Sequence, residues 1–158
     1  MTRTPQIARV RDAAKRLTAC VRADARLTAS MVISRVSLPL LKHAINVRTL
    51  AGLMWSPPVA PFDGDRSRQE VERIRQFATI GGRLLVSTNC LDRSLTLYRL
   101  LSRAGAKPVL LLGARKTSDA TDGHAWIELD GQPFPGPDGE EYAPIVGFGA
   151  RGSPCPVT

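Results

Sequence analysis

Apolar residues in the first third of the chain recur every three or four positions, which is the spacing of a helix with one buried face. From Ile7 to about Ser30 the apolar stripe is interleaved with Arg and Lys, and it predicts an amphipathic basic helix. The stretch 31–53 is denser in Val, Ile and Leu, and Pro39 should kink or divide it because proline removes a helical hydrogen-bond donor. We therefore expect two packed helices ahead of the proline-rich link at 56–61.

Two further helices are predicted beyond this link. The first begins at a capping box, Ser67–Glu70, and ends at the glycine pair 81–82. The second covers Asn89 to Ala104. Asn89 is its expected N-cap, because the side-chain oxygen can accept hydrogen bonds from the free amides of the first turn, and Gly105 supplies a left-handed stop.

After the second of these helices the pattern changes to that of β-strands. A continuous apolar run predicts a buried strand over 108–113, and the polar stretch 114–122 is expected to be a loop. Alternating residues over 124–130 predict a second strand, which turns at Asp130–Gly131, and a short third strand is expected at 145–148. Helices followed by a few hairpin-joined strands are typical of an α+β fold.

Charge divides the chain near the same place as the proline-rich link. The 158 residues fit one ordinary domain, or a small domain with a helical extension. Residues 1–50 hold ten of the 22 cationic side chains but two of the 14 acids, so they account for the whole net charge of +8. We expect a basic helical region over 1–60 and a catalytic domain over 61–158, and not a uniformly basic nucleic-acid-binding surface.

The cysteines are few, odd in number and widely spaced, at Cys20, Cys90 and Cys155. Without a C-x-x-C pair, and with His43 and His124 as the available nitrogen ligands, neither a disulfide framework nor a structural zinc site is expected. The longest uncharged stretch, 49–62, is interrupted by three prolines and does not predict a transmembrane helix. We expect a cytoplasmic protein with reduced thiols.

Cys90 and His124 are the candidates for nucleophile and base. Cys90 falls in the first turn of a predicted helix, where unpaired amides and the helix dipole favour an anion. His124 begins a strand, and histidine titrates near the pH at which a base and acid must work. The alternatives are a buried small hydrophobe for Cys90 and a surface residue for His124. Their order along the chain makes the pair more specific than either residue alone.

A third group should hold the imidazole in its orientation and tautomer. If Asp130–Gly131 form a two-residue turn, residue 137 lies opposite His124, which favours Asp138. The other acids considered for this role are Asp130, Glu140 and Glu141. By strand alternation Trp126 shares the face of His124 and is expected to line or shield the site.

These residues stand in two recognisable motifs. The first, at 89–95, reads N-C-L-D-R-S-L, and the second, at 123–131, reads G-H-A-W-I-E-L-D-G. Together with the helical entry 35–53, they resemble the transglutaminase-like cysteine peptidases of lasso-peptide biosynthesis over most of the chain. The resemblance implies an α+β, transglutaminase-like or papain-like core, in which a helix bearing Cys90 packs on a small antiparallel sheet, with an N-terminal helical extension.

The resemblance also implies an activity and its partners. Cys90 and His124 would cleave the leader from a precursor peptide, and Asp138 is the nearest match to the family's third residue, an Asp expected near position 136. The chain resembles the stand-alone peptidase, without the leader-recognition domain that is fused in other members. The expected partners are the precursor peptide, a separate leader-recognition protein and a macrolactam synthetase. No cofactor is expected to bind directly, and any ATP dependence would come through a partner.

Three other functions remain open from the residues. A transglutaminase would keep the thioester intermediate but transfer the acyl group to an amine, and product mass separates this from hydrolysis. A domain whose triad has decayed would act as a binding module. A nucleic-acid binder that uses the basic N-terminal arm is the remotest alternative, and salt-sensitive binding to a duplex would support it.

Overall fold

The structure is a computed structural model that describes residues 46–58, 64–81, 89–137, 139 and 141–157, with the isolated helical positions Thr18, Ala25 and Ala29. The predictions that concern the basic helix over 7–30 and the stretch around Pro39 therefore fall almost wholly outside the described residues. The same holds for Asp138 and Glu140.

The described helices are α3 (Val47–Met54), α4 (Gly64–Gly81), α5 (Cys90–Arg103) and the short 3-10 helix η1 (Ala150–Gly152). The prediction for α5 is confirmed at both ends. The Asn89 side chain accepts a hydrogen bond from the Leu91 N–H at 2.9 Å, and Gly105 follows the helix with a φ of +83°. The predicted end of α4 at Gly81 is also confirmed.

The predicted start of α4 at the capping box is wrong, because the helix already begins at Gly64. Asp65 lies in the first turn, where a carboxylate interacts favourably with the helix dipole. Glu70, the expected partner in the capping box, instead forms an ion pair with Arg73 at 2.9 Å one turn further along. Asp65 therefore favours a helix that begins before the predicted capping box.

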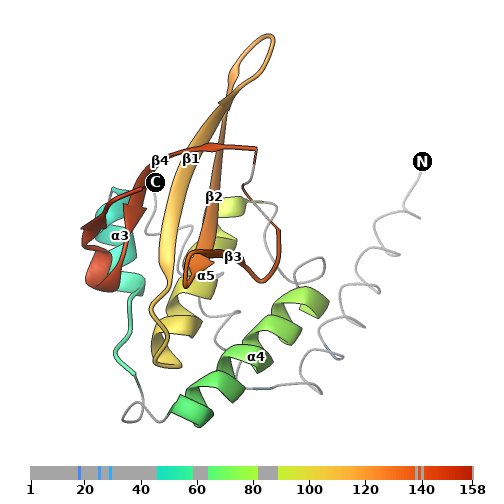
Figure 1. Cartoon of the computed structure of the whole chain (residues 1–158), viewed down its shortest axis with the longest axis vertical. Helices are drawn as coiled ribbons and strands as arrows, with labels where there is room; N and C mark the ends of the chain where they lie inside the picture. Colours follow the sequence, from blue (N-terminus) through green and yellow to red (C-terminus); the bar gives the residue numbers. More distant parts are fainter. Residues whose placement is uncertain are drawn as a thin grey trace, which may run out of the picture.

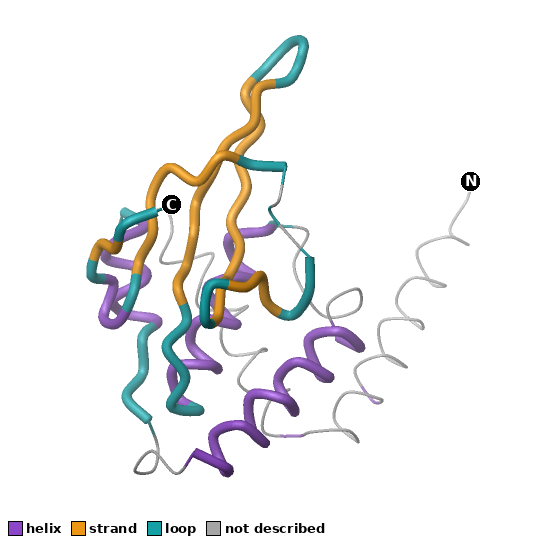
Figure 2. Tube along the Cα trace, viewed as in Figure 1, coloured by secondary structure: helices purple, strands orange, loops and turns teal. Residues whose placement is uncertain are grey.

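The sheet has five antiparallel strands in the order β3-β2-β1-β4-β5 (Figure 1). The strands are β1 (Val109–Lys116), β2 (Thr121–Leu129), β3 (Gln132–Phe134), β4 (Ala143–Phe148) and β5 (Pro154–Cys155). The two longest, β1 and β2, form a hairpin that projects beyond the helices (Figures 1 and 2). These observations confirm an α+β fold with a small antiparallel sheet.

The predicted loop over 114–122 is wrong, because most of it belongs to the β1–β2 hairpin. Ala114 pairs with Gly123 and Lys116 with Thr121, so the connection shrinks to residues 117–120. The side chains of this part are polar because the projecting hairpin is exposed to solvent on both faces. They do not prevent the backbone hydrogen bonds between β1 and β2.

The predicted two-residue turn at Asp130–Gly131 is confirmed. Both residues have positive φ, +54° and +75°, and Leu129 pairs with Gln132 across the turn. The ladder ends at Phe134, however, so the expected pairing of residue 137 with His124 is wrong. Pro135 follows directly and has no N–H to extend the ladder.

One face of the sheet packs against the helices and forms the core (Figure 1). Leu110 and Ile127, which pair across β1 and β2, contribute to this face, and α5 packs on it. The buried members of the core are Leu50, Ala51, Met54, Ile74, Phe77, Ala78, Leu95, Leu97, Tyr98, Leu100, Leu101, Leu110, Ile127, Phe134 and Phe148. Most of α5 is therefore held by burial of apolar side chains.

Helix α3 joins the same core although it precedes the proline-rich link. It contacts α5 and η1, and Gly152 of η1 packs so closely that a Cβ there would lie 2.6 Å from the Gly52 nitrogen. The Tyr98 hydroxyl of α5 donates to the carbonyl oxygen of Gly149, which holds the chain just before η1. The division of the chain into 1–60 and 61–158 stays a prediction.

The opposite face of the sheet carries the Trp126 side chain, which packs between two glycines. A Cβ at Gly113, on β1, would lie 2.8 Å from the indole, and a Cβ at Gly139 would lie 2.5 Å from it. Gly139 has a φ of +79° and belongs to the connection between β3 and β4. This connection therefore crosses the outer face of the sheet and lies directly on Trp126.

We expect Gly139→Ala to destabilise the protein by about 1–3 kcal/mol, the usual cost of overpacking. The new Cβ would collide with the indole, and a positive φ is strained for any residue with a side chain. The free energy of unfolding from urea titration measures the effect.

The matched control is Gly136→Ala, in the same connection, where a Cβ would have nothing within 4 Å. Its unfolding free energy should lie within roughly 0.5 kcal/mol of the parent. Equal stability of the two variants would contradict the packing of this connection on Trp126.

Candidate active site

Cys90 is the first residue of α5 and is half-buried. Asn89 caps the helix with its side chain, and its carbonyl oxygen accepts from the Arg93 N–H at 3.3 Å. The first N–H groups of a helix have no partners within it, and the helix dipole is positive at this end. The Cys90 thiol therefore lies at the end of the helix whose N–H groups can donate to a nearby oxyanion.

Ser94 ties the first turn of α5 to β2. Its hydroxyl, which is 1% exposed, donates to the carbonyl oxygen of Ala125 at 2.8 Å. Ser94 lies one turn after Cys90 on the same side of the helix, and Ala125 follows His124 directly. The hydrogen bond thus brings the helix segment that begins with Cys90 to the strand segment that contains His124.

The contact uses an edge of β2 that β3 leaves uncovered. The pairing of β3 reaches only residues 127–129 of β2, so the backbone around Ala125 has no neighbouring strand on that side. The start of α5 occupies this position instead. The early end of β3 is therefore part of how the candidate site is built.

His124 lies among aromatic rings on the outer face of the sheet. Its imidazole stacks with the Tyr142 ring at 4.7 Å between centroids and 22° between planes, and with Trp126 at 6.1 Å and 15°. The predicted placement of Trp126 on the face of His124 is thereby confirmed. The imidazole is nearly parallel to both neighbouring rings.

Burial lowers the pKa of His124 below its ordinary value of 6.5, and the positive charge of Arg93 lowers it further. The negative charge of Asp122 raises the pKa of His124, and the positive charge of Arg115 on β1 lowers it. His124 is therefore neutral at neutral pH, the form that accepts a proton from a thiol. The influence of Arg93 also indicates that the first turn of α5 lies near the imidazole.

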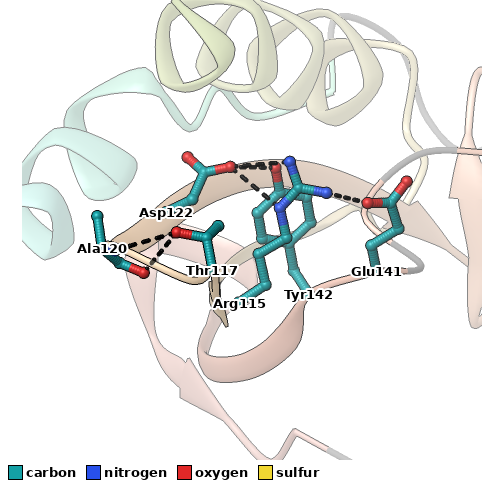
Figure 3. A network of polar contacts seen from close by, with 6 residues as sticks. All are labelled: Arg115, Thr117, Ala120, Asp122, Glu141 and Tyr142. Atoms are coloured by element: carbon teal, nitrogen blue, oxygen red, sulfur yellow. Dashed lines mark hydrogen bonds and ion pairs between the residues drawn. The ribbon is translucent and has the colours of Figure 1, made fainter.

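A polar network surrounds the Tyr142 side chain (Figure 3). The Tyr142 hydroxyl donates to Asp122 Oδ2 at 2.8 Å, and Arg115 Nε donates to the same oxygen at 3.1 Å. Arg115 also forms an ion pair with Glu141, and its guanidinium lies 4.8 Å from the Tyr142 ring centroid. The Tyr142 hydrogen bond is the largest cause that lowers the pKa of Asp122, so this carboxyl is ionised at neutral pH.

The acids considered for the third role have different positions. Asp138 and Glu140 lie outside the described residues. Asp130 is exposed at the hairpin turn, and Glu141 pairs with Arg115. The third role of Asp138 therefore stays a prediction.

Ser94, Asp122 and Tyr142 are not among the site residues that the sequence predicts. Two of them left a signal: Asp122 is two residues before His124 and so shares its face by strand alternation, and Ser94 is one helical turn after Cys90. Tyr142 left none, because its contact with His124 depends on the path of the chain between β3 and β4.

Among the other predicted candidates, Cys155 is half-buried in β5, and burial raises the pKa of its thiol. Cys20 and His43 lie outside the described residues. Within the described part of the chain no group of three or more His, Cys, Asp or Glu side chains could hold a metal ion. No helix in that part is long and apolar enough to cross a membrane.

In this structure a helix that begins at a cysteine is tied to an antiparallel sheet that bears a histidine. The model of the transglutaminase-like superfamily matches residues 34–147, more than half of the chain, and the chain belongs to this superfamily. The superfamily includes cysteine peptidases and transglutaminases. No curated protein and no solved structure matches the chain significantly.

We expect the His124 imidazole to titrate below pH 6.5, and Arg93→Gln to raise its midpoint, because the substitution removes a positive charge that disfavours the imidazolium. The measurement is an NMR pH titration of the ring protons, with His43→Gln to assign the two histidines.

Two controls isolate the charge of Arg93. Arg93→Lys keeps a cation at the site, and Arg103→Gln removes one at the far end of α5. Both should leave the His124 midpoint close to that of the parent. An Arg93→Gln midpoint equal to the parent value would show that this charge does not act on His124.

Proposed function

We propose that this protein is a cysteine peptidase that removes the leader from the ribosomally made precursor of a lasso peptide. The observation that carries the peptidase activity is the hydrogen bond from Ser94 to Ala125, which links the helix segment of Cys90 to the strand segment of His124. The motifs at 89–95 and 123–131 support the choice of substrate.

In the proposed reaction, neutral His124 takes the proton of the Cys90 thiol, and the thiolate attacks the carbonyl carbon of the scissile peptide bond. The imidazolium then protonates the departing amine, which leaves a thioester on Cys90. Water, activated by His124, attacks the thioester, and the carboxylic acid leaves as the thiol forms again. The lowered pKa of His124 supports its role as the base in the first step.

Charge on the carbonyl oxygen would develop near the start of α5. The backbone N–H groups at the start of α5, together with the Asn89 side chain, are the proposed oxyanion donors. Asp138 is proposed as the acid that accepts from the imidazole and fixes its tautomer.

The proposed setting is the cytoplasm, with reduced thiols. A separate leader-recognition protein would deliver the precursor, and a macrolactam synthetase that uses ATP would close the ring on the amino terminus that cleavage frees. The basic segment 1–50 is the proposed surface for one of these partners or for an acidic part of the leader.

The test is mass spectrometry of a candidate precursor after incubation with this chain and the neighbouring recognition protein. We expect cleavage at one junction by the parent and none by Cys90→Ala. A product whose mass shows an added amine in place of water would indicate acyl transfer. Binding of the precursor without any change in its mass would indicate a non-catalytic module.

We expect Ser94→Ala to lower kcat/KM for leader cleavage by on the order of 10²-fold, because small displacements of reacting groups have effects of this size. The substitution removes the hydrogen bond between α5 and β2. Single-turnover kinetics on the precursor measure the effect.

The matched control is Ser102→Ala, since Ser102 is also buried in α5 but donates to Tyr98 within the same helix. Each substitution should cost about 1 kcal/mol of unfolding free energy. Only Ser94→Ala should reduce cleavage, and equal rates for the two variants would contradict a positioning role for Ser94.

A further inference from the structure

Side chains from two strands contact the Tyr142 side chain. Asp122 comes from β2 and Arg115 from β1, while Tyr142 itself lies just before β4. The hydroxyl of Tyr142 is held by Asp122 at 2.8 Å, and its ring lies against the Arg115 guanidinium (Figure 3). Both the end and the face of this side chain therefore have contacts that limit its rotation.

The backbone of Tyr142 is held as well. Its N–H donates to the carbonyl oxygen of Gly139 at 2.9 Å, and Gly139 lies directly against Trp126. Trp126 is 4% exposed and is two residues after His124 on the same strand face. The turn that presents Tyr142 is thus anchored on the strand that carries His124.

The Tyr142 ring then forms a wall for the imidazole. The two rings lie 4.7 Å apart and nearly parallel, so rotation of the imidazole out of its plane would bring it against the Tyr142 ring. Stacking of this kind fixes the plane of the imidazole. It does not select between the two orientations related by a 180° flip of the ring, and that selection needs a hydrogen-bond acceptor such as the proposed Asp138.

We propose that Tyr142, held in place by Asp122 and Arg115, is a positioning residue that fixes the plane of the His124 imidazole for its proton transfers with Cys90. The inference rests on the proposed peptidase function and adds to it residues that the motifs at 89–95 and 123–131 do not assign to the reaction. It divides the control of His124 between a ring that sets its plane and an acid that sets its tautomer.

Several charged or titratable groups act on His124 from the surrounding elements. They are Arg93 on α5, Arg115 on β1, Asp122 on β2 and Tyr142 before β4, with Cys90 as its proposed reaction partner. Removal of the Tyr142 ring would admit water to the imidazole, and loss of desolvation raises the pKa of a histidine. Loss of the Asp122 charge would lower the pKa of His124.

The experiment compares Tyr142→Leu, which removes the ring, with Tyr142→Phe, which keeps the ring and loses the hydroxyl. For leader cleavage we expect kcat to fall by roughly 10–100-fold in Tyr142→Leu, with KM little changed, and by about fivefold or less in Tyr142→Phe. Ile145→Ala, an exposed position on β4, is the control with parent kinetics.

NMR of His124 gives a readout that does not depend on peptidase activity. In Tyr142→Leu the ring-current shift of the imidazole protons should decrease, because the Trp126 ring alone remains, and the titration midpoint should rise towards 6.5. Tyr142→Phe should keep both near the parent values. If Tyr142→Leu shows these NMR changes but the parent cleaves no precursor, the result contradicts the proposed peptidase function and leaves the packing of His124 on Tyr142 intact.

Two outcomes overturn the positioning role. The first is a kcat for Tyr142→Leu that equals the parent value, whatever its NMR spectrum. The second is a Tyr142→Leu variant that loses activity although the titration of His124 is unchanged. If Tyr142→Leu does not fold, Asp122→Asn and Tyr142→Phe decide the question. At a pH well above the His124 midpoint, each should lower kcat about equally and the double variant no further, whereas additive losses would show that Asp122 does not act through Tyr142.

Discussion

The hydroxyl of Ser94 donates to the carbonyl oxygen of Ala125 across the interface between α5 and β2. This buried bond joins the helix that begins at Cys90 to the strand that carries His124, and the candidate site depends on it. Its acceptor is available because β3 ends at Phe134 and leaves this edge of β2 uncovered. A longer β3 would compete with the helix for the same backbone groups. The position of α5 on β2 therefore depends on the early end of β3.

One face of the sheet forms the core, and the other carries residues of the candidate site. The inner face packs against α5, which α3 and α4 contact in turn, and these elements share one apolar core that fixes where α5 lies. The outer face carries Trp126 and His124, and the connection between β3 and β4 crosses it. Strand alternation places each side chain on one face or the other, so a single strand, β2, serves both the core and the candidate site.

The electrostatic surroundings of His124 follow from this arrangement. The first turn of α5 brings the Arg93 charge near the imidazole, while the β1–β2 hairpin brings Asp122 and Arg115. Burial and the charges of Arg93 and Arg115 favour the neutral imidazole, whereas the Asp122 carboxylate favours the imidazolium. The same Asp122 orients Tyr142, so the charge and the ring plane of His124 are governed by one group of residues on the outer face.

The sequence alone determined the features that depend on neighbouring residues. The cap at Asn89, the stop at Gly105, the turn at Asp130–Gly131 and the shared face of His124 and Trp126 follow from local hydrogen bonding, backbone preference and strand alternation. The Cys and His motifs also indicated the superfamily to which the chain belongs.

Other features were decided by contacts between distant segments. The polar stretch 114–122 joins the hairpin because two strands exchange ladder hydrogen bonds, although its composition suggests a loop. Tyr142 stacks on His124 because the β3–β4 connection crosses the sheet and rests on Trp126 through Gly139. Local propensity and alternation carry no information about such a crossing, since it depends on packing between residues that are far apart in the chain, and only the tertiary structure reveals it.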